Sequence, residues 1–170
     1  MCGIWALLGF TDEEIRQYGL CDWIQISHRG PDSSRVETVH GVPYAYFGFH
    51  RLQINDMIFG MQPMRVHAYP HIWVLFNGEV YNAFTLRDYY EFSFETHCDT
   101  EIIIHLYERF GAEKTVAMLD GVFGLAILDT KQRQLYLARD IFGVKPLFTF
   151  LSGKGKHVYT NSSCTFAQIS

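Results

Sequence analysis

Residues 122–128 constrain the fold more than any other part of the sequence. None of these seven residues carries a polar side chain, and the run follows a turn at Asp120-Gly121. A strand with one face in water alternates apolar and polar side chains, so an unbroken apolar run indicates a strand covered on both faces. The sequence therefore predicts a layered domain in which other elements pack against both sides of this strand.

Further apolar runs predict strands at 4–8, 44–50, 71–76, 135–138, 144–150 and 157–160. We expect the third of these strands to stop at Asn77-Gly78, a common turn dipeptide. Helical spacing and a following Gly111 predict a helix over 99–110, with a second at 112–119 and a third from Thr11 or Asp12 to about 26. The order of strands, helices and strands favours an α+β fold with mainly antiparallel sheets.

Composition narrows the class of protein. A length of 170 residues, 48% hydrophobic and 19% charged, suits one globular domain and excludes a disordered chain. The net charge of 14 − 18 = −4, without a basic stripe, argues against nucleic-acid binding. No run approaches the roughly 20 apolar residues of a membrane span. Four scattered cysteines without a C-x-x-C pair, and a start without a basic region, predict a reduced, cytoplasmic protein.

Cys2 is the first candidate for chemistry. If Met1 is removed, Cys2 carries a thiol and a free α-amine on one carbon, and the amine can serve as the base that activates the thiol. The alternative is that a small residue follows Met1 by chance. Asn77, Gly78 and the following Glu79 form a second candidate, because an amide side chain and a neighbouring main-chain N–H can stabilise an oxyanion. The alternative for this pair is the hairpin turn.

Two charged residues and one pair of residues have two interpretations each. Asp99 is either a helix cap or a carboxylate that faces a ligand ammonium group. Arg51 forms either a surface ion pair or a fork for a ligand carboxylate. Glu101 and His105 have the i, i+4 spacing of metal ligands, but an exposed or half-buried pair is the more common meaning, and we predict no metal site.

Eight ordered motifs between Met1 and about Phe148 carry a family resemblance. They are Met1–Leu7, His28–Asp32, Gly48–Leu52, Gly60–Pro63, Phe76–Asn82, Cys98–Glu101, Leu119–Phe123 and Arg139–Leu147. With them the chain resembles the class II glutamine amidotransferases, and within that class the N-terminal glutaminase domain of the asparagine synthetases. The resemblance implies a four-layer αββα sandwich of the N-terminal nucleophile hydrolase type.

The resemblance also implies roles for single residues. Cys2 would attack the side-chain amide of L-glutamine, giving a thioester and ammonia, with Asn77 and the Gly78 N–H as the oxyanion hole. Arg51 would hold the substrate α-carboxylate, and Glu79 and Asp99 its α-ammonium group. Main-chain groups near Leu52 and Ile54 would line the same pocket. The half-reaction would need no cofactor.

The chain departs from the family pattern after about residue 160. We expect the domain to be incomplete at its C-terminus, and the ATP- and Mg²⁺-dependent synthetase domain to be absent, because no glycine-rich phosphate loop occurs. Released ammonia would then need a synthetase domain or a full-length family enzyme as a partner. A homodimer is also compatible with the resemblance. The alternative function is a non-catalytic truncated product that only binds glutamine or a protein.

Overall fold

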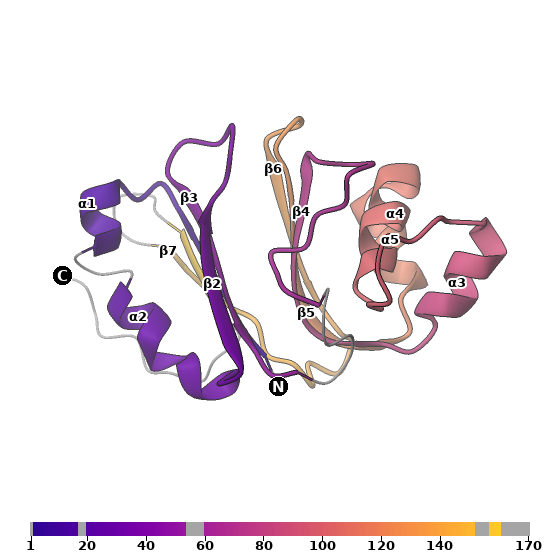
Figure 1. Ribbon diagram of the computed structural model, residues 1–170, viewed down its shortest axis with the longest axis horizontal. Coiled ribbons are helices and arrows are strands. Elements are labelled where there is room, and N and C mark those ends of the chain that lie inside the picture. The colour runs from indigo at the N-terminus through magenta and orange to yellow at the C-terminus, as the bar shows by residue number, and fades with distance from the viewer. Residues whose placement is uncertain (1, 17–19, 54–59, 152–156, 161–170) are drawn as a thin grey trace.

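The computed structural model describes residues 2–16, 20–53, 60–151 and 157–160 of the chain (Figure 1). The strands are β1 (Gly3–Leu8), β2 (Ser33–Thr38), β3 (Ala45–Arg51), β4 (Ile72–Val80), β5 (Gly121–Asp129), β6 (Gln134–Arg139), β7 (Phe148–Leu151) and β8 (His157–Thr160). The helices are α1 (Asp12–Glu14), α2 (Leu20–Gln25), the short 3-10 helix η2 (Ser27–Arg29), α3 (Ala83–Tyr90), α4 (Glu101–Phe110) and α5 (Ala112–Met118). The predicted α+β class is confirmed.

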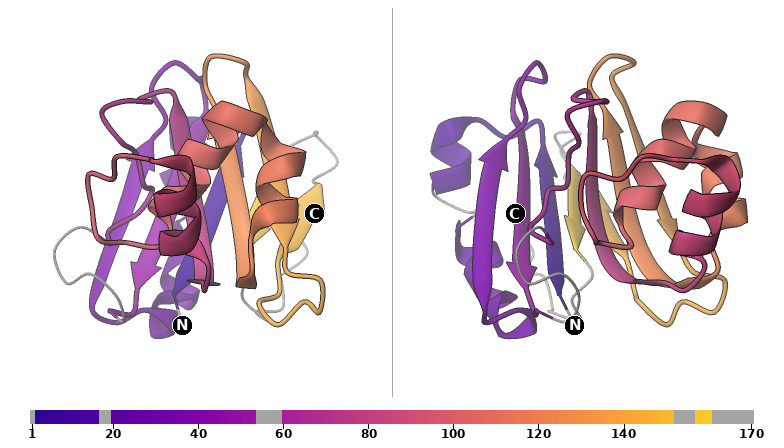
Figure 2. Two further views of the ribbon diagram at one scale, coloured as in Figure 1. Left: turned by 90° about the vertical axis from the view of Figure 1, so that its right-hand side faces the viewer. Right: turned by 45° about the vertical axis from the view of Figure 1, so that its right-hand side comes forward.

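The strands form two sheets, and every pairing is antiparallel, as the sequence predicts. The first sheet has the order β2-β3-β1-β8-β7, and the second has the order β4-β5-β6. Figures 1 and 2 show the sheets face to face, with α1 and α2 outside the first and α3, α4 and α5 outside the second. None of the helices in the described part of the chain is long and apolar enough to cross a membrane.

Strand β5 is buried on both faces, as its unbroken apolar run predicts. Ala126 and Leu128 point into a core between the sheets, where they meet side chains of β1, β3 and β4, including Phe47 and Trp73. Leu125 and Ile127 point the other way, into a core that includes α4. Alternate residues of one strand therefore serve two cores, so β5 can carry no polar side chain before Asp129.

Several boundaries differ from the sequence prediction; the strand expected at 144–150, for example, begins only at Phe148 as β7. Strand β4 does not stop at Asn77-Gly78 but pairs with β5 as far as Val80, opposite Gly121. Long-range pairing therefore overrides the turn preference of the dipeptide. The helix expected from Thr11 begins with a capping box, in which Thr11 and Glu14 exchange hydrogen bonds. Helix α2 follows within the range that was predicted as one helix, and residues 17–19, between α1 and α2, lie outside the described residues.

One strand and one α-helix, besides the short η2, were not predicted from the sequence. Strand β2 and helix α3 have many exposed or half-buried positions, so the sequence shows no strong apolar pattern for either of them. Both still matter for the site, because β2 pairs with β3 up to Arg51, opposite Ser33, and α3 follows directly on the end of β4. The start of β1, the end of β3 and the end of β4 lie toward one end of the two sheets, where Figure 1 also places the N-terminus.

Candidate active site

A cavity of about 100 Å³ opens at this end of the domain. Its walls come from both sheets, from the turn that precedes α4 and from the segment between β6 and β7. Of the eight residues that the sequence predicts for a site, Ile54 lies outside the described residues, and the other seven all line this cavity. The lining residues are Cys2, Phe49, Arg51, Leu52, Gly60, Gln62, Phe76, Asn77, Gly78, Glu79, Cys98, Asp99, Thr100 and Lys145.

Cys2 is held at the start of β1 by the main chain that leaves β3. Its thiol accepts a hydrogen bond from the Leu52 N–H at 3.4 Å and donates to the Leu52 carbonyl at 3.5 Å. Burial raises the pKa of the Cys2 thiol, while the Leu52 N–H and the positive charges of Arg51 and Arg29 act in the opposite direction. The thiol is therefore mostly protonated near pH 7, and a base is needed to turn it into a nucleophile.

Asn77 carries a buried amide with an unused donor. The residue is 2% exposed, and its Nδ2 has no hydrogen-bond partner among the described residues. An unpaired buried amide donor costs about 1–3 kcal/mol, so such groups are rare unless a ligand uses them. Because Asn77 also lines the cavity, its Nδ2 is a donor available to a bound molecule.

The main chain of β4 presents a second row of donors. Strand β4 lies at the edge of its sheet, and on the open side the Phe76 N–H donates to the Gln62 side chain at 2.6 Å. Four residues further on, the Val80 N–H donates to Asp99 at 2.7 Å. Main-chain groups alternate along a strand, so the Gly78 N–H, midway between these two, faces the same open side.

Gly78 is required by the packing of the two strands. A Cβ atom at this position would lie 2.0 Å from the Val122 carbonyl oxygen and 2.7 Å from Cα of Phe123. No side chain therefore fits between β4 and β5 here. The sequence interpretation of Asn77-Gly78 as a hairpin turn is wrong, because the glycine serves a close approach inside a strand.

Charged groups of both signs border the cavity. Arg51, at the end of β3, is only 7% exposed, so its interpretation as part of a surface ion pair is wrong. Asp99 is not the helix cap that one interpretation expected: α4 begins at Glu101, and the Asp99 carboxylate accepts from Val80 on β4. Burial raises the pKa of Asp99, and the nearby charge of Glu79 adds to this, against the hydrogen bonds from Val80 and Cys98. Two neighbouring carboxylates favour a bound cation.

Two lining residues, Gln62 and Lys145, were not assigned a role from the sequence. The Gln62 amide closes the edge of β4, since its Nε2 donates to the Phe76 carbonyl at 3.0 Å while its Oε1 accepts from the Phe76 N–H. Lys145 is brought to the cavity by Asp140, whose buried carboxylate accepts main-chain N–H groups from Phe123, Phe142, Val144 and Lys145. Both residues lie in motifs that carry the family resemblance, and this was the one sequence feature that could have marked them as site residues.

Glu101 and His105 form a buried pair, so the exposed or half-buried interpretation is wrong. Glu101 is 0% and His105 5% exposed, and His105 Nε2 lies 3.2 Å from a Glu101 oxygen. No group of three or more His, Cys, Asp or Glu side chains in the described ranges is arranged to hold a metal ion.

A cysteine thiol, a buried amide without a partner among the described residues, and charges of both signs meet at one cavity, and these are groups that amide-transfer chemistry requires. The sequence profile of the family described as "Glutamine amidotransferase domain" matches residues 1–167, and the chain belongs to this family. Its curated relatives include the asparagine synthetases [glutamine-hydrolyzing] of Rattus norvegicus and Mus musculus, each 48% identical over 155 residues, and that of Homo sapiens, 46% identical over the same length. These matches cover 91% of this chain and 27% of each relative.

Proposed function

We propose that this domain hydrolyses the side-chain amide of L-glutamine to glutamate and ammonia, with Cys2 as the nucleophile. The proposal rests mainly on one observation: beside the cavity that Cys2 lines, the Nδ2 of buried Asn77 has no hydrogen-bond partner in the described part of the chain. A buried donor without a partner is what a transition state with a developing oxyanion requires. Family membership and the glutamine-hydrolysing relatives support the same activity.

The chemistry proceeds in two steps once Met1 is removed. The α-amine of Cys2 takes the thiol proton, and the sulfur attacks the amide carbon of the substrate. Asn77 Nδ2 and the Gly78 N–H stabilise the oxyanion. The C–N bond then breaks, and ammonia leaves with the proton returned by the amine. Water attacks the resulting glutamyl thioester, the C–S bond breaks, and glutamate and the Cys2 thiol are released.

Recognition of the amino-acid end of glutamine uses the charged rim of the cavity. Arg51 pairs with the α-carboxylate, and Glu79 and Asp99 bind the α-ammonium group, with main-chain groups of Leu52 in the same pocket. Glutamate is rejected because its second carboxylate cannot donate hydrogen bonds, which leaves polar groups of the site unpaired. This half-reaction uses no cofactor.

We propose further that the two sheets and their outer helices form the four-layer αββα sandwich of the N-terminal nucleophile hydrolases. The chain spans 27% of the length of the relatives named above. Following the family resemblance, the ammonia would serve the amidation of aspartate on a synthetase domain, which would use ATP and Mg²⁺. That domain, or a full-length family enzyme, is then the partner of this chain.

The test is glutamate release from glutamine by the Met1-free chain without ATP, measured by a coupled glutamate assay. We expect turnover by the wild-type chain and none by Cys2→Ala, with both proteins folded by circular dichroism. Equal rates for the two proteins would refute the nucleophile. Glutamine binding by calorimetry without any turnover would favour the non-catalytic alternative instead.

A further inference from the structure

The buried carboxylate of Glu101 lies outside the cavity, and the mechanism above does not use it. Its two oxygens accept four hydrogen bonds. Oε1 accepts from the Glu95 N–H at 2.7 Å and from His105, and Oε2 accepts from the Thr96 N–H at 2.7 Å and the Thr96 hydroxyl at 2.6 Å. Three of these donors belong to one short segment, Glu95-Thr96, that precedes α4.

The pair with His105 is fixed by aromatic rings. The His105 ring stacks on Phe92 and Phe94, with centroid distances of 5.1 and 5.3 Å, and Tyr69 meets its edge at 5.5 Å. Despite its burial, Glu101 has a lowered pKa, because the hydrogen bonds from His105, Thr96 and Glu95 outweigh desolvation. An ionised carboxylate only accepts, so Nε2 of His105 carries the hydrogen. The carboxylate is thus rigidly placed.

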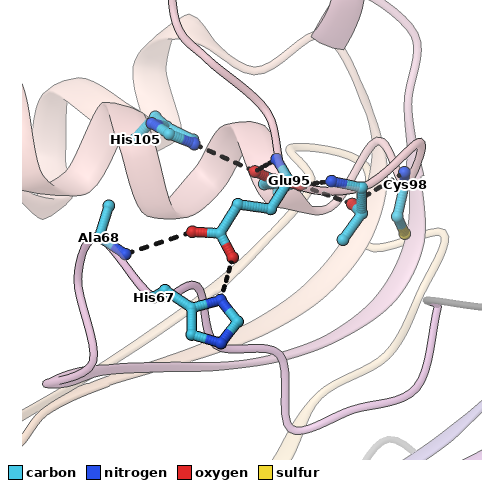
Figure 3. Close-up of polar contacts among 7 residues, drawn as sticks. His67, Ala68, Glu95, Cys98 and His105 are labelled. Carbon is cyan, nitrogen blue, oxygen red and sulfur yellow. Dashed lines mark hydrogen bonds and ion pairs between the residues drawn. The ribbon is translucent and has the colours of Figure 1, made fainter.

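A chain of contacts leads from Glu101 to the cavity. The Thr96 hydroxyl, which donates to Glu101, accepts from the Cys98 N–H at 3.1 Å. The next residue is Asp99, whose carboxylate reaches Val80 and borders the cavity. On the outside, Glu95 accepts from His67 at 2.6 Å and from the Ala68 N–H at 3.2 Å, as Figure 3 shows. The segment 95–99 is therefore held from both sides.

We propose that Glu101 is a positioning residue for substrate recognition: it sets the place of the Asp99 carboxylate by anchoring the segment that carries it. This inference rests on the proposed function, in which Asp99 binds the α-ammonium group of glutamine. Glu101 itself does not touch the substrate. Its loss would displace Asp99 while leaving Cys2, Asn77 and Gly78 in place, because Cys2 directly precedes β1 and the other two lie on β4.

The test is Glu101→Gln, which keeps the shape but directs an NH₂ group at main-chain donors. Two substrates are compared in the Met1-free chain, L-glutamine and 4-carbamoylbutanoate, which is glutamine without its α-ammonium group. We expect kcat/KM for glutamine to fall about tenfold, mainly through KM, as for one weakened charged hydrogen bond. We expect kcat/KM for 4-carbamoylbutanoate to change by less than about twofold, since it makes no ammonium contact.

Tyr107→Phe is the matched control. It removes a buried hydrogen bond of 3.0 Å to Asp129 from the same helix, away from segment 95–99, and the ratio of the two kcat/KM values should stay at the wild-type level. An equal loss for both substrates in Glu101→Gln, or an unchanged ratio, would overturn the inference while the proposed function stands. An inactive wild-type chain would overturn both. If Glu101→Gln does not fold, Thr96→Val weakens the same anchor and must shift the ratio in the same direction.

Discussion

Replacing Asn77 by alanine should separate catalysis from stability. The Nδ2 donor has no partner among the described residues, so the folded protein already carries its desolvation cost of about 1–3 kcal/mol. Deleting the amide removes this cost, and the gain offsets the packing energy that is lost with the smaller side chain. We expect the free energy of unfolding to change by less than about 1 kcal/mol. In the transition state the same donor meets the oxyanion, and its loss should lower kcat by about 10²–10³.

Asn82 provides a matched control a few residues along the chain. Both ends of its amide are used, since Nδ2 donates to the Met118 carbonyl at 2.9 Å and Oδ1 accepts from the Asp120 N–H at 3.0 Å. Asn82→Ala removes both hydrogen bonds, of which the one to Met118 is partly buried and the one from Asp120 is exposed, and should cost about 0.5–1.5 kcal/mol of stability. At roughly 2–4 °C per kcal/mol, its thermal midpoint should fall visibly, while kcat stays near the wild-type value.

The assay is glutamate release under saturating glutamine, together with thermal unfolding of the three proteins. We expect opposite profiles, with Asn77→Ala nearly inactive but stable and Asn82→Ala active but less stable. If Asn77→Ala keeps more than about a tenth of wild-type kcat, its amide is not an oxyanion donor. If it unfolds at a temperature as low as Asn82→Ala does, the amide serves the fold instead.

Three further predictions follow from the geometry of the site. Asp99→Asn retains an acceptor for the Val80 N–H but loses its charge, so steady-state kinetics should show KM for glutamine raised about 10–100-fold with kcat little changed; a selective loss of kcat would show that its role is not binding. Gly78→Ala should lower the free energy of unfolding in urea by more than about 3 kcal/mol, because its Cβ would lie 2.0 Å from the Val122 carbonyl oxygen. Gly124→Ala, whose Cβ meets nothing closer than 3.5 Å, should lower it much less, and similar urea midpoints for the two variants would contradict this packing. In the chain that retains Met1, the pKa of the Cys2 thiol is raised, so the rate of its alkylation by iodoacetamide should keep rising with pH beyond the range in which free cysteine titrates. The rate is followed at the Cys2 peptide by mass spectrometry, and a plateau near pH 7 would be inconsistent with a buried, protonated thiol.

Local sequence patterns predicted the elements whose apolar spacing is unambiguous. Strand β5 is an unbroken apolar run, and α4 combines helical spacing with Gly111 at its end. Strand β4 was predicted too short because Asn77-Gly78 has a strong local turn preference. Its continuation depends on pairing with Gly121–Phe123, more than forty residues away, which no local pattern contains.

The candidate site was predictable only in part for the same physical reason. The motifs marked Cys2, Asn77 and Asp99 as candidates. They did not show that the Asp99 carboxylate accepts a hydrogen bond from the end of β4. The pair Glu101–His105 is polar and spaced like an exposed helix pair. Its burial depends on the rings of Tyr69, Phe92 and Phe94, which come from segments outside α4 and become visible only in three dimensions.

The proposed mechanism passes through a covalent intermediate on Cys2, which can be observed directly. The Met1-free chain is mixed with L-glutamine, quenched in acid during turnover and analysed by intact-mass and peptide mass spectrometry. We expect an added mass equal to glutamine minus ammonia, located on the Cys2 peptide and missing from Cys2→Ala. An adduct on another residue, or glutamate release that persists in Cys2→Ala, would contradict it.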